Sequence, residues 1–402
     1  MKGALRSGEF VPLVALLMSL VALSTDAMLP ALPAIGRDLG VVRANDVQFV
    51  VTSLFLGLGA GQLLFGPLSD GIGRKPSIGA GLLVFMAGCL VSTFALSFSG
   101  MIAGRFLQGI GAAGPRVVTL ALVRDQYRGR AMARLMSFVM TVFILVPAVA
   151  PALGQGILRL GSWRAIFAVF FAMALIALGW FLLRQPETLP ASRRRPLSPR
   201  EFGKAVREVL RTRSAIGHTV AAGCVYAPFV AYLSSAQQIF QEAYRTGAMF
   251  PFWFGVLALA LGGASLANGR LVMRHGMRRL SRVAAISVTL TSAAALPLAI
   301  PFDGLPPFGL FLGWLIVVFF AIGLLFGNLN ALAMAPLGHI AGVGAAVVAA
   351  LSTLIAVPLG GFVGQGFDGT MVPLIGAFAG FGALTLAALR WAGGGAAGRS
   401  RN

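Results

Sequence analysis

Twelve apolar runs divide the sequence, and they constrain its fold more than any other feature. Each is close to the length of about 20 residues that a helix needs to cross about 30 Å of hydrocarbon. The chain is 57% hydrophobic and 11% charged, which leaves too few polar side chains to hydrate the surface of a soluble domain. We therefore expect an all-α membrane protein with twelve transmembrane helices. The runs cover roughly residues 10–33, 47–67, 77–98, 100–122, 136–158, 164–184, 214–238, 248–272, 280–300, 307–335, 340–366 and 370–391.

Basic residues set the expected orientation. The net charge is +20, but the bases lie in short loops between apolar runs, as topology signals do, and this argues against a nucleic-acid partner. With the N-terminus inside, the inner loops hold Arg74, Lys75, Arg124, Arg128, Arg130, Arg134, Arg193, Arg194, Arg195, Arg200, Lys204, Arg207, Arg211, Arg213, Arg270, Arg274, Arg278, Arg279 and Arg282. The outer loops hold Arg37, Arg43, Arg159, Arg164 and Arg245. This bias predicts two cytoplasmic termini and a multi-pass protein of the cell's inner (plasma) membrane.

The first run and the two cysteines have structural interpretations. No A-x-A cleavage site follows the basic N-terminus MKGALRSGEF, and the run continues to Asp26 and Pro30. We therefore expect a retained first span rather than a removed signal peptide. Cys89 and Cys224 both lie inside apolar runs, so we interpret them as small core residues rather than as a disulfide framework.

The two halves of the chain resemble each other. The string GPLSDGIGRK (66–75) follows the second run and GRLVMRHGMR (269–278) follows the eighth, with glycines seven residues apart in both. ALGQGIL (152–158) and FVGQGF (362–367) form a second pair of similar strings. Six spans, a polar segment and six similar spans are typical of a duplicated transporter. We expect a six-helix bundle at 1–190, a cytoplasmic linker at 191–213 and a second, pseudo-symmetric bundle at 214–402.

The linker contains EFGKAVREVLRT (201–212), which has helical spacing and a basic face. Two interpretations remain open. The segment either lies on the inner membrane surface or is a solvated linker that its charge holds inside.

The string at 66–75 resembles the signature between spans two and three of the major facilitator superfamily, G-x-L-a-D-r-x-G-r-k. It departs from that pattern at Gly71, where the family usually has arginine. The glycines permit a tight turn, and Asp70 could take a helix N-terminus or an arginine partner. The resemblance implies a conformational latch, which Gly71 would weaken. The latch residues would be Gly66, Asp70, Gly73, Arg74 and Lys75.

Further strings resemble the drug:proton antiporter group and its bicyclomycin/chloramphenicol-resistance (Bcr/CflA) branch. The fourth run holds R-F-L-Q-G from Arg105, and the fifth resembles the antiporter motif G-P-x-x-G-G through Pro147, Pro151 and Gly154, with Ala150 and Gln155 replacing two glycines. TDAMLPALPAI (25–35), GSWRAIF (161–167), RQPETLP (184–190), NGRLV (268–272) and ALAMAPLGHIAG (331–342) extend the resemblance over nearly the whole chain. It implies export of drug-like compounds by alternating access in exchange for protons.

Three ionisable side chains remain inside the spans of the first half: Asp26, Arg105 and Arg116. Burial raises the pKa of a carboxylate and a nearby guanidinium lowers it, so helix movement could change a carboxylate's affinity for protons. We expect Asp26 to carry the proton, and the resemblance gives Arg105 the role of its coupling partner. The two arginines lie eleven residues apart, which puts them on one helix face about 16 Å apart. Structural pairing or snorkelling is the alternative for each.

The substrate cavity is expected to include Asp26, Arg116, Tyr226, Asn328 and Asn330. One acid and two arginines would leave it neutral to positive, which favours neutral or anionic substrates over lipophilic cations. Hydrogen bonds between helices are the alternative role for the polar residues of the second half.

Two rival functions remain. An uptake symporter or facilitator for a specific small metabolite would use the same fold, and the direction of substrate flow separates it from an exporter. A membrane enzyme or receptor would need chemistry that the sequence lacks, because H-E-x-x-H, G-x-S-x-G and P-loop motifs are absent and His218, His275 and His339 are scattered. We therefore expect no enzyme activity, no cofactor and no metal, only protons, a small-molecule substrate and the lipid bilayer as partners, and a monomer.

Overall fold

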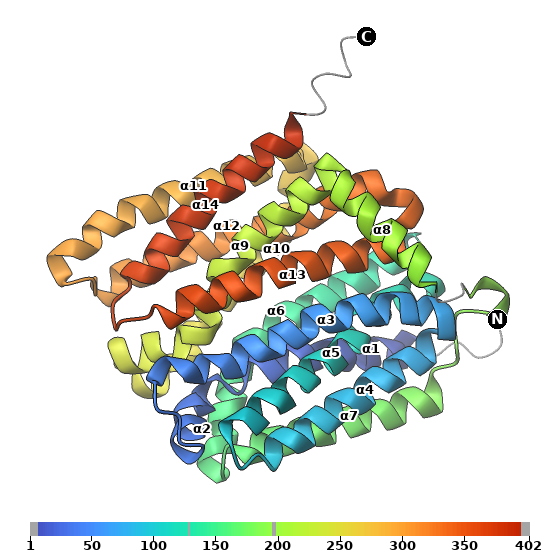
Figure 1. Cartoon of the computed structure of the whole chain (residues 1–402), viewed down its shortest axis with the longest axis horizontal. Coiled ribbons are helices and arrows are strands. Elements are labelled where there is room, and N and C mark those ends of the chain that lie inside the picture. Colours follow the sequence, from blue (N-terminus) through green and yellow to red (C-terminus); the bar gives the residue numbers. More distant parts are fainter. Residues whose placement is uncertain (1–6, 128, 195–197, 395–402) are drawn as a thin grey trace. The chain divides into compact units, whose positions relative to one another are not determined.

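A computed structural model describes residues 7–127, 129–194 and 198–394 of the chain (Figure 1). Regular structure in these ranges is entirely helical. Of the basic residues assigned to inner loops, Arg128 and Arg195 lie outside the described residues, as do the side chains of Arg130 and Arg134. The chain divides into two compact units, Met1–Phe202 and Gly203–Asn402, which we call unit 1 and unit 2.

Unit 1 contains the first six spans. In α1 and α2 the first span is interrupted, because a 3₁₀ turn at Leu29–Ala31 with Pro30 at its centre separates the two helices. Proline cannot donate a backbone hydrogen bond, which explains the break just after Asp26. The helices are α1 Ser7–Asp26, α2 Leu32–Asp38, α3 Phe49–Ile72, α4 Arg74–Thr93, α5 Phe98–Gln126, α6 Gly129–Leu160 and α7 Arg164–Arg184.

The amphipathic helix α8 (Pro199–Arg211) leads into unit 2. The spans of that unit are α9 Arg213–Gln237, α10 Phe250–His275, α11 Met277–Ala299, α12 Phe308–Met334, α13 Ala341–Gln365 and α14 Val372–Gly393. Eleven of the twelve predicted runs each coincide with one long helix in the described residues, and the first run covers α1, the 3₁₀ turn and the start of α2. The predicted fold is therefore confirmed. Among the described residues, ten stretches are long and apolar enough to cross a membrane, one of which, 308–365, holds both α12 and α13.

The repeated strings occupy equivalent places in the two units. Gly73 is the single residue between α3 and α4, with φ 112° and ψ 164°. Gly276 separates α10 from α11 with φ 76° and ψ 151°. Such positive φ values suit glycine and strain other residues. The turn is tighter than the sequence suggested, because Gly66 and Asp70 are still helical within α3 and Gly73 alone reverses the chain.

Glycines bring the helices of unit 1 into backbone contact. Helix α5 packs between α3 and α4. A Cβ atom on Gly109 would overlap the carbonyl oxygen of Leu54, one on Gly57 would overlap that of Phe106, and one on Gly111 would overlap the backbone nitrogen of Phe85. Small residues permit this kind of close helix packing in membranes, where lipid provides no hydrophobic force between helices.

This packing predicts the effect of a single added methyl group. Gly109→Ala should lower the free energy of unfolding by about 1–3 kcal/mol, because the α3 backbone must move away from α5. The measurement is the thermal unfolding midpoint in detergent micelles. Gly179→Ala in α7 is the matched control, since its Cβ would meet nothing within 4 Å. Equal midpoints for the two variants would contradict the prediction.

Candidate functional site

Asp26 carries a buried carboxylate that has no partner among the described residues. It is the last residue of α1 and is 5% exposed. Its carboxylate forms no hydrogen bond or ion pair with any residue that the structure describes. An ionised carboxylate in such a place is costly, because burial removes most of the hydration that stabilises its charge. A side chain of this kind suits reversible binding of a proton or of a substrate group.

Arg105 is fully buried in α5. It contacts α1 two residues before Asp26 but does not pair with the Asp26 carboxylate. Its Nη2 donates to the carbonyl of Ser24 at 2.9 Å and its Nε to the carbonyl of Val50 at 3.0 Å. Its Nη1 donates to Oε1 of Gln108 at 2.5 Å. The guanidinium is therefore satisfied by neutral acceptors on α1, α3 and α5. Direct pairing with Asp26 does not occur in this conformation, and the coupling role of Arg105 stays a prediction.

Gln108 was not assigned a role from the sequence, although it stands in the R-x-x-Q-G string. Residues three apart share a helix face, and this spacing was the available signal. Gln108 is fully buried, accepts from Arg105 and donates to Sγ of Cys89 at 3.2 Å. It orients Arg105 from the α5 side.

The antiporter motif lies directly against the Asp26 region. Helix α6 packs on α1 and on the 3₁₀ turn that follows it. A Cβ on Gly154 would overlap the carbonyl oxygen of Ala27. Pro147 and Pro151 both lie inside α6, and Pro151 is buried. The motif glycine thus allows α6 to approach the residue next to Asp26.

Arg116 shares α5 with Arg105 but has a different environment. Its side chain is half-buried, next to Pro115, and forms no hydrogen bond or ion pair with any residue that the structure describes. The alternative that Arg116 pairs structurally elsewhere therefore finds no support in the described part of the chain.

The predicted cavity residues of unit 2 differ in their surroundings. Tyr226 is half-buried and stacks on Phe229, with ring centroids 5.8 Å apart, and it meets Phe326 edge-on at 5.6 Å. Asn328 is buried in a reciprocal amide pair with Asn268, at 2.9 and 3.1 Å. This pair joins α12 to α10, as the alternative role of hydrogen bonds between helices anticipated. Asn330 is exposed on α12, and substrate binding by these residues stays a prediction.

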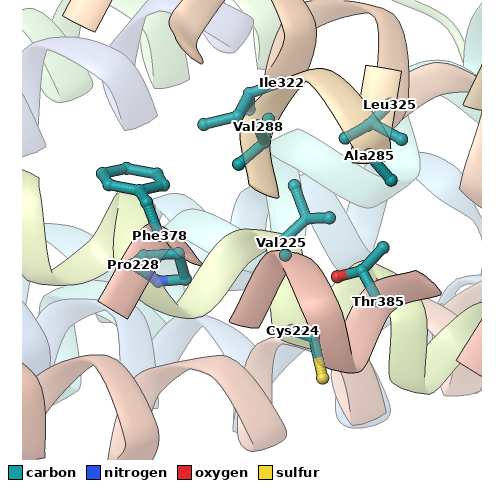
Figure 2. A pocket seen from close by; sticks show the side chains of 10 residues that line it. Cys224, Val225, Pro228, Ala285, Val288, Ile322, Leu325, Phe378 and Thr385 are labelled. Carbon is teal, nitrogen blue, oxygen red and sulfur yellow. The ribbon is translucent and has the colours of Figure 1, made fainter. Parts of the chain in front are cut away.

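A small cavity lies inside unit 2 (Figure 2). Ten residues of α9, α11, α12 and α14 line it, and all but two of their side chains are apolar or absent. The hydroxyl of Thr385 already donates to the carbonyl of Phe381 at 2.8 Å, and the other polar group is the thiol of Cys224. This chemistry does not match an amphipathic substrate, so the cavity is a packing gap in the bundle.

Two of the residues predicted to form a latch, Asp70 and Arg74, take part in an ion-pair cluster at one end of unit 1. The Nη1 of Arg74 donates to Oδ1 of Asp70 at 2.5 Å and to Ser69 at 2.8 Å, and its Nε donates to Oδ2 of Asp125 at 3.1 Å. Thr188 also donates to Asp125, at 3.1 Å. Arg74 therefore joins the end of α3 to the end of α5. Asp125 was not predicted, because it lies 51 residues from Arg74 along the chain.

Glu187 caps the N-terminus of α4, a role that the sequence analysis had considered for Asp70. Its carboxylate accepts from the backbone N–H groups of Arg74 and Lys75, both at 3.0 Å. It also accepts from the N–H groups of Thr188 and Leu189, at 2.9 and 2.8 Å. An anion at a helix N-terminus is stabilised by free N–H groups and by the helix dipole. The Nζ of Lys75 donates to the carbonyl of Leu182 at 2.7 Å, which attaches α4 to the end of α7.

The comparison with known proteins identifies the family. Residues 14–360 match the Major Facilitator Superfamily. The chain belongs to the major facilitator superfamily. It is therefore a membrane transporter and not an enzyme, as the sequence predicted.

Two curated relatives are similar over most of their length. The chain is 30% identical to the uncharacterised transporter YdgK of Bacillus subtilis, over 90% of both chains. It is 30% identical to a bicyclomycin resistance protein homolog of Haemophilus influenzae, over 68% of this chain and 69% of that protein. The predicted Bcr/CflA branch of the drug:proton antiporters is thereby confirmed. The chain also resembles the crystal structure of the human organic anion transporter MFSD10, with a TM-score of 0.69 over 96% of this chain and 99% of that one. The two sequences are 17% identical, so this similarity supports the fold alone.

The cap formed by Glu187 gives a stability prediction. Glu187→Gln should lower the free energy of unfolding by about 2 kcal/mol, because one oxygen that accepts backbone N–H bonds becomes a donor amide facing them. The thermal unfolding midpoint of the purified protein is the measurement. Glu208→Gln is the matched control, since Glu208 forms a half-exposed ion pair with His339 and such pairs contribute at most about 1 kcal/mol. Equal thermal unfolding midpoints for the two variants would show that the Glu187 cap does not stabilise the protein.

Proposed function

We propose that this superfamily transporter exports small amphipathic compounds by alternating access, and that Asp26 carries the coupling proton. The observation that carries the proposal is the burial of the Asp26 carboxylate at the end of α1 without a partner among the described residues. The resistance to bicyclomycin named for the Haemophilus influenzae relative supports export of a drug-like compound.

In the proposed coupling, the affinity of the Asp26 carboxylate for protons differs between the outward-open and the inward-open state. From the outside, a proton adds to a carboxylate oxygen of Asp26 and removes the cost of a buried charge. On the inside the proton leaves, and substrate binding and proton binding exclude each other at the same group. Arg105 contributes by holding the carbonyl of Ser24, two residues before Asp26. A shift of α1 relative to α5 would bring the guanidinium closer to Asp26 or take it farther away, and so change the carboxylate's affinity for protons.

Substrate recognition is proposed for Asp26 and Arg116 of unit 1 and for Tyr226, Asn328 and Asn330 of unit 2. The half-buried guanidinium of Arg116, which has no partner among the described residues, offers charge-assisted hydrogen bonds to acceptor groups. The ring of Tyr226, stacked on Phe229, offers an aromatic surface. Neutral or anionic amphipathic compounds match this set. The six-helix bundles at 1–190 and 214–402 would move against each other around the linker at 191–213, in a monomer with both termini cytoplasmic.

Proton movement in inverted vesicles tests the coupling. Addition of a substrate should dissipate an imposed pH gradient in vesicles that hold the intact chain. Asp26→Asn should abolish this response, because a side-chain amide does not change its protonation state near neutral pH. Asp303→Asn is the control, since Asp303 is exposed and has φ 52°, a conformation that asparagine tolerates. An Asp26→Asn protein that still accumulated substrate against its gradient would refute the proposal, and substrate flow in the direction of the protons would favour the uptake symporter.

Arg116 provides a test of substrate charge. Arg116→Gln should reduce transport of anionic compounds about tenfold, as expected for the loss of one charge-assisted hydrogen bond of about 1.5 kcal/mol, while cationic compounds are unaffected or improved. The measurement is the concentration of compound that gives half-maximal proton release. Arg124→Gln removes an exposed charge from the same helix and serves as control. Equal losses for anionic and cationic compounds would exclude charge recognition by Arg116.

A further inference from the structure

The first span, which carries Asp26, is attached to α7 at both of its ends. Two carboxylates make these attachments: Glu9 in the first turn of α1, and Asp38, which is the last residue of α2. Neither carboxylate takes part in the transport mechanism proposed above. Helix α7 is thus the common support for both ends of a span that is interrupted at Leu29–Ala31.

Glu9 accepts hydrogen bonds from two side chains in the last turns of α7. Its Oε1 accepts from Nε1 of Trp180 at 3.1 Å and from Nε of Arg184 at 2.7 Å. Its Oε2 accepts from Nη2 of Arg184 at 2.9 Å. The guanidinium therefore contacts both carboxylate oxygens, a geometry that is more specific than a single ion pair. We call these three residues the Glu9 anchor.

Asp38 makes the equivalent contacts at the opposite end of α7. Its Oδ2 accepts from Nε1 of Trp163 at 2.8 Å and from Nη1 of Arg164 at 3.3 Å. Trp163 is 2% exposed, so the loss of this acceptor would leave a buried indole N–H without its hydrogen bond, which is costly. The guanidinium of Arg164 also lies 4.2 Å from the centre of the Trp163 ring. We call these three residues the Asp38 anchor.

Helix α7 is itself held by its neighbour α4, along which it packs. Nζ of Lys75, in the first turn of α4, donates to the carbonyl of Leu182 at 2.7 Å. Nη2 of Arg164 donates to the carbonyl of Ala95, just beyond the end of α4, at 3.2 Å. The two anchors therefore attach the first span to a helix that is fixed near both of its own ends.

The separation of the anchors does not match the length of a straight span. A regular helix from Glu9 to Asp38 would be about 44 Å long, whereas the anchoring residues of α7 are separated by about 24–32 Å along its axis. The span can contact both anchors because it is interrupted at the 3₁₀ turn Leu29–Ala31, where its direction can change. Asp26 lies beside this bend, between two fixed ends.

We propose that Glu9 and Asp38 are positioning residues for proton coupling, because the two anchors fix the ends of the first span on α7 and confine its movement to the bend beside Asp26. This inference rests on the proposed role of Asp26 as the proton carrier. With both ends fixed, a movement of the bend opens the carboxylate to one side of the membrane at a time. With one end released, the Asp26 segment exchanges protons with both sides in the absence of substrate, and the transporter leaks protons.

Proton leak without substrate tests this role. Vesicles that hold the full-length protein receive an imposed pH gradient, and a pH-sensitive dye follows its decay per molecule of inserted protein. Asp38→Ala should raise the rate of decay about twofold or more, and Glu9→Ala should do the same, because either change releases one end of a span that has to expose Asp26 to one side at a time. Asp38→Glu keeps a carboxylate that can accept from Trp163, so it should leak less than Asp38→Ala.

A double variant separates positioning from a general loosening of the bundle. Addition of Asp26→Asn to Asp38→Ala should return the leak to the level of Asp26→Asn alone, whereas a leak through a loosened bundle would not depend on Asp26. Asp46→Ala is the matched control. It removes an ion pair of 3.1 Å with Arg43 inside the segment between α2 and α3, and it should leave the leak unchanged.

A distance measurement tests the Asp38 anchor itself. Spin labels at Arg37→Cys and Val169→Cys report the separation of α2 and α7, since both positions are exposed and the two native cysteines are buried. With the anchor intact, the distribution of distances between the labels should be narrow. Asp38→Ala should broaden it, because α2 is then no longer held on α7, whereas Asp46→Ala should not.

Three results would overturn the inference. They are equal leak rates for the anchor variants and the intact protein, a leak that persists in the double variant, and an unchanged distance distribution in Asp38→Ala. Failure of the proposed function would be seen elsewhere, as proton-coupled export that is retained by Asp26→Asn with both anchors intact.

Discussion

The structure of unit 1 depends on how one buried guanidinium is satisfied. Arg105 has no carboxylate partner in the described residues, and it makes its hydrogen bonds to the carbonyls of Ser24 and Val50 and to Gln108. Each of these acceptors lies on a different helix or on a different turn of α5, so one side chain fixes α1 and α3 against α5. Removing any acceptor would leave a buried charge with an unmade hydrogen bond, which is costly in a medium without water. The three acceptors are all neutral, so among the described residues the guanidinium of Arg105 and the carboxylate of Asp26 do not pair with each other.

The same region explains why a glycine and two prolines occur together in α6. Gly154 allows the backbone of α6 to contact Ala27, the residue after Asp26. Pro147 and Pro151 each remove a backbone donor from α6, and a helix with missing donors bends more easily than a regular one. A bend in α6 would therefore move the surface on which the Asp26 segment rests. The string that resembles the antiporter motif therefore contacts the residue next to Asp26, although Pro151 and Asp26 are about 125 residues apart in the sequence.

The sequence predicted the number, the length and the order of the spans because the membrane imposes an apolar length on every one of them. It was less accurate at the C-terminal ends of α3 and α5, where Asp70 and Gln126 remain helical beyond the apolar runs. Asp26 and Arg105 could be found because an ionisable group inside a span is rare. The acceptors of Arg105 could not, since backbone carbonyls have no signature in a sequence. A hydrogen bond between helices was anticipated for Asn328, but its partner Asn268 was not, because the pair depends on the rotation of two helices and its members are 60 residues apart in the chain.

The two units share an inter-helix glycine but not the chemistry around it. In unit 1 the residues beside Gly73 are neutralised, because Asp70 and Asp125 contact Arg74 and Glu187 caps α4. In unit 2 the residues beside Gly276 are Arg274, His275 and Arg278, all exposed, and the first turn of α11 holds no acid. An ion-pair network joins three helices of unit 1 at this end, whereas the equivalent end of unit 2 is left positively charged. The two units therefore share the backbone geometry of this turn but differ in the charges around it: unit 1 is internally cross-linked there, whereas unit 2 presents cations to its surroundings.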